Sequence, residues 1–146
     1  MRNLLVCIAL ALSLGACGQG TRAVTEVDKA SLAEHETQWG QRSFHSYTFD
    51  YSEAQLTTSY NVHITVTNDS VTNVLDNRTG QPPAVPRTWP TIGQLFGEAD
   101  FFANDGGYSV TIDYDETYGY LTLLSAQPSN PGGSFLARTS NLQPTE

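Results

Sequence analysis

The alternation of apolar and polar side chains predicts an antiparallel hairpin in the first half of the chain. Residues 47–51 and residues 60–66 each place an apolar or aromatic side chain at every second position, which is the pattern of a strand with one buried face. Asn68 and Asp69 follow the second run, and both residue types tolerate the positive φ of a two-residue hairpin turn. Residues 71–75 are therefore expected to form the returning third strand.

Two other segments show helical spacing. In residues 28–42, large side chains recur at intervals of three and four positions, which predicts a helix. The segment 91–104 predicts a second helix with one apolar face. Thr91 opens it and Gln94 lies three residues later, so the two residues have the spacing of a capping box.

The strand pattern returns after the second helix. Apolar residues alternate over 108–114, and a turn at 115–119 leads into a last strand at 120–125. The proline-rich segment 77–90 can only form a loop. We therefore expect an α+β fold in the order α-β-β-β-α-β-β, with an antiparallel sheet of about five strands packed by two helices.

The N-terminal residues have the parts of an export signal. Arg2 precedes an apolar run at 4–14 and two small residues, and the run is shorter than the ~20 residues that span a bilayer. The sequence Leu14-Gly15-Ala16-Cys17 resembles the bacterial lipobox, which implies a lipid on the Cys17 thiol and cleavage before it. An ordinary signal peptide with a chance cysteine, or a buried N-terminal helix, is the alternative.

This interpretation divides the chain into four parts. Residues 1–16 are the lipoprotein signal peptide, and residues 17–27 are a lipidated polar tether. Residues 28–127 form a single α+β domain, and residues 128–146, rich in Pro, Ser, Gly and Asn, are expected to be a loose C-terminal tail. The membrane is then the partner of the lipid on Cys17, and the protein lies on the exported side of the cell envelope, at the outer membrane if the cell has two membranes.

Composition limits the partners of the mature protein. Removal of the signal takes away Arg2 and Cys7 and leaves six basic against fifteen acidic residues, a net charge of −9. A chain this acidic does not bind nucleic acid through its phosphates, nor an anionic membrane through charge. Without a second cysteine the mature domain has no disulfide, so its stability must come from a hydrophobic core.

No residue pattern in the chain predicts a metal site, a cofactor or a catalytic residue. The three histidines lack the spacing of a zinc site, and no serine-nucleophile or phosphate-loop motif occurs. Asp113, Asp115 and Glu116 form the densest acidic group, which we interpret as a solvated turn. A shared cation such as calcium and an acid/base pair remain alternatives for it. The histidines are His35, His45 and His63.

Aromatic residues are the one feature that bears on binding. Tyr108 and Tyr114 are in phase with the apolar residues of their strand, so we assign them to the core. Tyr118 and Tyr120, at the last hairpin, and Trp89, in the proline loop, are the candidates for a binding surface, because exposed aromatics mark such surfaces.

One tryptophan and three short segments carry a family resemblance. Trp39 precedes a strand that reads S-Y-T-F-D-Y at 46–51, T-I-G-Q-L-F follows at 91–96, and residues 112–120 read I-D-Y-D-E-T-Y-G-Y. Over about residues 36–126 the chain resembles a bacterial family catalogued as a domain of unknown function, number 6174. Members of that family are small envelope proteins, often lipoproteins. The resemblance implies no catalytic residues, because the family has no established activity.

These observations favour a lipid-anchored envelope protein with a non-catalytic binding or interaction module, whose partner is a further envelope component. We favour this function because the apolar residues follow the pattern of a folded core, while no set of residues matches a catalytic motif. An inhibitor of a secreted hydrolase that presents the loop at 81–90 is one alternative. A small hydrolase that uses Asp113 or Asp115 is another.

Overall fold

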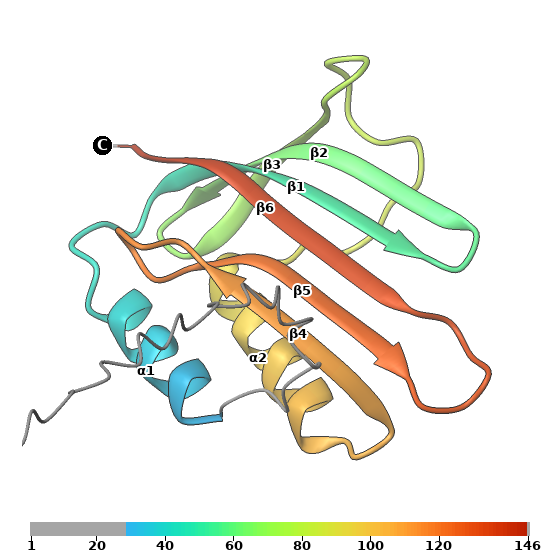
Figure 1. The fold of residues 1–146 in the computed structure, drawn as a ribbon. Coiled ribbons are helices and arrows are strands. Elements are labelled where there is room, and N and C mark those ends of the chain that lie inside the picture. The colour runs from blue at the N-terminus through green and yellow to red at the C-terminus, as the bar shows by residue number, and fades with distance from the viewer. Residues whose placement is uncertain (1–28, 146) are drawn as a thin grey trace, which may run out of the picture.

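Two helices cover one face of an antiparallel sheet in the computed structural model, which describes residues 29–145 (Figure 1). The α+β class and the two predicted helices are confirmed. The elements in chain order are α1 (Lys29–Gly40), β1 (Tyr47–Gln55), β2 (Thr58–Thr67), β3 (Ser70–Asp76), α2 (Ile92–Asn104), β4 (Tyr108–Tyr114), β5 (Leu121–Pro128) and β6 (Phe135–Pro144).

The sheet has the strand order β3-β2-β1-β6-β5-β4, and every neighbouring pair is antiparallel. Alternate residues of β1 and β2 point toward the helices, as their period of two requires. Phe49 and Ile64 are opposite each other in the register and are fully buried. Leu95 and Phe96 of α2 join the same core, so the apolar face of the helix packs on the apolar face of the sheet.

The expectation of five strands and a loose tail at 128–146 was wrong. Strand β6 lies inside the sheet, between β1 and β5, and is the red arrow that crosses the middle of Figure 1. Its inward face holds Phe135, Ala137 and a buried threonine, Thr139, whose hydroxyl donates to the carbonyl oxygen of Leu121. The alternation then breaks at Asn141, which has a φ of 54°. The alternation in residues 135–144 is short, mostly polar and interrupted, so the sequence did not predict a strand there. Pairing with strands that are distant in sequence stabilises β6.

Two local predictions are confirmed. Asn68 and Asp69 have φ values of 49° and 60° and join β2 to β3 in a two-residue turn. Thr91 and Gln94 form the complete capping box: the Thr91 hydroxyl accepts from the Gln94 N–H, and the Gln94 side chain accepts from the Thr91 N–H. Both features are set by residues a few positions apart, so local sequence determines them.

The predicted signal peptide and tether, including Cys17, lie outside the described residues. Within residues 29–145, neither helix has the length and apolar character needed to cross a bilayer.

Candidate functional site

A cavity of about 610 Å³ opens on the helix-covered side of the sheet. Helix α2 forms one wall and the proline-loop segment 87–90 forms another, while the ends of β1 and β6 close the base. We call this cavity the α2 pocket. Its lining residues are Glu53, Gln55, Arg87, Thr88, Trp89, Pro90, Gln94, Gly97, Glu98, Phe101, Phe102 and Phe135.

A partly buried ion pair forms the polar base of the α2 pocket. Arg87 donates from Nη1 to Oε1 of Glu53 at 3.0 Å and from Nη2 to Oε2 at 2.9 Å, and only 7% of the Glu53 side chain is exposed. The Tyr51 hydroxyl donates to the same Oε2 at 2.7 Å. Burial alone would raise the pKa of Glu53, but the hydrogen bonds from Arg87 and Tyr51 outweigh it and hold the pKa below its ordinary value. Glu53 is therefore an ionised carboxylate with both oxygens hydrogen-bonded.

Two aromatic rings hold Arg87 in this position. Its guanidinium carbon lies 4.7 Å from the ring centre of Trp89 and 4.8 Å from that of Tyr60. The two rings meet edge to face at 5.3 Å. Cation–π contact and the bidentate pair with Glu53 act on the same group, so the arginine fixes the loop segment 87–90 against strand β1.

Glu98 of α2 is a second carboxyl group in the pocket and has a different environment. Burial raises its pKa above the ordinary value, the negative charge of Glu53 raises it further, and Arg87 offsets only part of this. Its Oε2 is enclosed and finds no hydrogen-bond partner among the described residues. Buried polar atoms are rarely left unpaired. The lining thus contains one carboxyl oxygen, Oε2 of Glu98, whose hydrogen-bonding capacity is unused.

The wall formed by α2 is largely aromatic, and Phe135 of β6 packs against it. Phe101 has 62% of its surface exposed, Phe102 packs on Phe135 with ring centres 5.3 Å apart, and Gly97 leaves the middle of the helix wall open, since a Cβ there would meet no atom within 4 Å. The pocket combines an apolar side with a few polar groups, the composition typical of small-molecule sites.

The three aromatic residues that the sequence nominated do not form an exposed surface. Trp89 is 8% exposed and Tyr120 is 6% exposed, so their nomination as surface residues was wrong. Trp89 nevertheless lines the pocket. Tyr118 is partly buried and packs edge to face on Phe44 at 5.2 Å. Short aromatic spacings do not distinguish core rings from surface rings, because both occur at strand ends.

Sequence reasoning missed Glu53, Arg87 and Glu98. One signal was available: Glu53 continues the period of two that points Tyr47, Phe49 and Tyr51 inward. A charged residue in an inward position requires a partner. Nothing in the sequence identified Arg87, which is 34 residues away, as that partner.

The acidic turn has a structural explanation. Asp113 is exposed. Asp115 accepts hydrogen bonds at its Oδ1 from the backbone N–H groups of Thr117 and Tyr118, at 3.0 and 2.7 Å. Residues 29–145 contain no group of three or more side chains that could ligate a metal ion. The turn chemistry of Asp115 accounts for this residue without a cation or an acid/base role.

Two of the three histidines are paired with aspartates and the third is stacked. His63 Nδ1 lies 2.9 Å from Asp50 Oδ1 on the outer face of the sheet. The ring of His35 stacks on that of Tyr114 with centres 3.8 Å apart.

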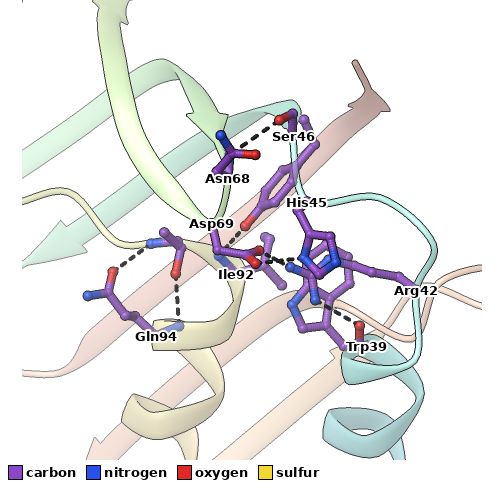
Figure 2. A network of polar contacts seen from close by, with 10 residues as sticks. Trp39, Arg42, His45, Ser46, Asn68, Asp69, Ile92 and Gln94 are labelled. Atoms are coloured by element: carbon purple, nitrogen blue, oxygen red, sulfur yellow. Dashed lines mark hydrogen bonds and ion pairs between the residues drawn. The ribbon is translucent and has the colours of Figure 1, made fainter. Parts of the chain in front are cut away.

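His45 belongs to a second polar cluster, which joins α1, α2 and the β2–β3 turn (Figure 2). Asp69, in that turn, pairs with Arg42 and contacts His45 Nδ1 at 2.7 Å. The guanidinium carbon of Arg42 lies 4.1 Å from the ring centre of Trp39, and Nη1 donates to the Trp39 carbonyl oxygen. Figure 2 shows the side chains of Arg42, His45 and Asp69 pointing toward one another. We therefore interpret this cluster as a structural joint and the α2 pocket as the candidate site.

Comparison with protein families places residues 31–130 in a family of unknown function, DUF6174, and the chain belongs to this family. The predicted resemblance is thereby confirmed. The match includes Glu53, Arg87 and Glu98 but ends before β6. A comparison with curated proteins finds no match.

Proposed function

We propose that this DUF6174 protein is a lipid-anchored protein of the bacterial envelope whose domain binds a small ligand in the α2 pocket without transforming it. The anchor rests on the sequence Leu14-Gly15-Ala16-Cys17 alone. Replacement of the thiol tests it directly: Cys17→Ser should abolish labelling with radioactive palmitate and release the protein from the membrane fraction. Labelling that persists in Cys17→Ser would refute the anchor.

One observation supports the binding proposal. Side chains do not fill the α2 pocket, and the ion pair between Glu53 and Arg87 holds its base in place. Its volume of about 610 Å³ lies in the range of small-molecule sites, roughly 300–1,000 Å³. The pair between Glu53 and Arg87 holds the loop wall, and α2 holds the other wall. A preformed cavity lowers the ordering cost of binding.

The arrangement of the two carboxyl groups favours binding over catalysis. Two carboxyls with pKa values displaced in opposite directions resemble an acid/base pair. However, both oxygens of Glu53 already accept hydrogen bonds from Arg87, and one also accepts from Tyr51. A general base needs a pKa near the operating pH, whereas these contacts lower the pKa of Glu53 and make it a weak base, so Glu98 lacks a strong catalytic partner. The alternative hydrolase based on Asp113 or Asp115 gains no support from the exposed and turn-forming positions of these residues.

A cavity-filling variant tests whether the pocket binds ligands. Gly97→Leu projects a side chain into the open space of the α2 pocket, and Gly93→Leu is a matched control on the first turn of the same helix, outside the lining. We would screen a library of small molecules by ligand-observed NMR. The proposal expects ligands that bind the wild type and Gly93→Leu but not Gly97→Leu. Ligands unaffected by Gly97→Leu, or no ligands at all, would refute it.

The hydrolase-inhibitor alternative retains one supporting observation. Val85, in the loop at 81–90, is 56% exposed, while Arg87 anchors the loop nearby through Glu53. An exposed residue on an anchored loop is a geometry that fits a protease cleft. Co-purification of a secreted hydrolase that disappears in Val85→Asp would support this second candidate, and absence of inhibition across a panel of secreted hydrolases would remove it.

A further inference from the structure

The charge balance of the α2 pocket limits the chemistry of its ligand. Three charged groups line it: Glu53, Arg87 and Glu98. The first two neutralise each other through the bidentate contact, and the guanidinium is also covered by two aromatic rings. Glu98 is left as the only acid in the lining without a basic partner.

The group that satisfies Glu98 must come from outside the pocket. Its enclosed Oε2 has no donor among the described residues. Other titratable groups near it are the carboxylate of Glu53, the guanidinium of Arg87 and the phenol of Tyr51. Tyr51 and Arg87 both donate to Glu53 instead. A ligand that brings a positively charged N–H donor would form a charge-assisted hydrogen bond, the strongest type available here.

The rest of the lining selects for an apolar body on that ligand. Phe101 and Phe102 lie on the same helix as Glu98, one turn further along, and Phe135 faces them from β6. The chain is also strongly acidic, with a net charge of −8, which attracts cations and repels anions at long range. An anionic ligand could not pair with Arg87, which already binds Glu53, and the negative charge of Glu98 would repel it.

We propose that the α2 pocket takes a small amphipathic amine, whose ammonium group hydrogen-bonds to Glu98 and whose apolar part lies against Phe101 and Phe102. This inference rests on the proposed function, since it names the ligand class of the same pocket. It also makes binding and proton release a single event. Glu98 holds its proton more tightly than an ordinary glutamate in the empty pocket, and it gives that proton to solvent when an ammonium group arrives.

The experiment uses three probes of equal chain length and different charge: n-hexylammonium, 1-hexanol and hexanoate. Calorimetric titration of the wild-type protein in buffers of different ionisation enthalpy measures both affinity and proton release. The titrations cover roughly pH 5 to 9, the range that contains raised glutamate pKa values. Glu98→Gln removes the charge in the pocket, and Glu116→Gln removes the same charge from an exposed position outside the lining.

We expect the ammonium probe to bind more tightly than the other two and to release protons on binding. Its affinity should rise with pH until Glu98 is ionised in the free protein. Glu98→Gln should weaken the ammonium probe by roughly tenfold or more, the loss expected for a charged hydrogen bond. It should leave hexanol binding unchanged, and Glu116→Gln should change neither.

The outcomes separate this inference from the proposed function. If hexanol or hexanoate binds as well as the ammonium probe, or if Glu98→Gln binds it equally well, the amine inference is overturned while ligand binding in the pocket stands. If none of the three probes binds and the screen with Gly97→Leu also finds no pocket ligand, both proposals fail.

Discussion

Replacing Arg87 by methionine should expose how much the buried ion pair matters to the fold. Methionine keeps an unbranched stem against Trp89 and Tyr60 but leaves the Glu53 carboxylate without its two hydrogen bonds from the guanidinium. Removal of one partner from a buried pair costs about 3–5 kcal/mol. The Arg87 side chain is 28% exposed and the Tyr51 hydroxyl remains as a donor, so we expect the lower end, about 3 kcal/mol.

Urea unfolding of the purified protein measures this cost, and two further variants interpret it. Glu53→Gln combined with Arg87→Met removes the stranded charge, so the double variant should be more stable than the sum of the single changes predicts, by about 1 kcal/mol or more. Arg78→Met removes an exposed arginine and should change the free energy of unfolding by less than about 0.5 kcal/mol.

The cost of Arg87→Met should also depend on pH. In the wild type the pKa of Glu53 lies below its ordinary value of 4.5, so the stability from the pair is present above that value and is lost as the pH falls through the folded pKa. In Arg87→Met burial dominates and raises the pKa of Glu53, so acid neutralises the stranded charge. The difference between the two proteins should therefore shrink as the pH falls from the raised pKa of the variant, above 4.5, to the lowered pKa of the wild type. A cost under about 1 kcal/mol, or one that is equal at neutral and acid pH, would refute this account of the pair.

Three further predictions concern the core, the C-terminal strand and Glu98. Tyr47→Phe should lower the free energy of unfolding by about 1 kcal/mol in urea titrations, because the Ile92 N–H loses its buried acceptor at 3.3 Å; an unchanged midpoint would contradict this. A chain that ends before Phe135 should show no cooperative thermal transition, since the two halves of the sheet are joined only through β6; a truncated chain that still unfolds cooperatively would contradict it. Glu98→Gln should stabilise the protein above the raised pKa of Glu98, and this gain should shrink as the pH falls through that pKa and be absent below the ordinary glutamate value of 4.5, because protonated Glu98 carries no buried charge; urea midpoints that differ equally in alkaline and acid buffer would contradict it.

Most of the fold could be predicted where the determining residues are close together in sequence. The turn at Asn68 and Asp69 and the capping box at Thr91 depend on contacts between neighbouring residues. The alternation of apolar and polar residues in β1 and β2 is also a local signal, because the residues of each strand alone indicate which of its faces is buried. These elements were confirmed since no distant partner is needed to specify them.

The parts that could not be predicted depend on partners that are distant in sequence. Strand β6 is held by β1 on one side and β5 on the other, and its register opposes Ser140 to Asp50, ninety positions earlier in the chain. The α2 pocket joins position 53 to positions 87 and 98 from a loop and a helix. Only the inward position of Glu53 was readable from the pattern, and it indicates an unusual site without identifying its partner.

The position of Glu53 argues that the ion pair serves the pocket rather than the stability of the sheet. A hydrophobic residue at this inward position would extend the core, and replacing a buried pair by apolar residues is often neutral or stabilising. The pair instead fixes Arg87, and through it the segment 87–90, at a defined distance from α2. An apolar pair would let this segment collapse onto Phe101 and Phe102 and fill the space, because unfilled apolar cavities are destabilising. A charged pair keeps the loop at the edge of the cavity, and Glu98, with its unpaired Oε2, belongs to the lining of that cavity.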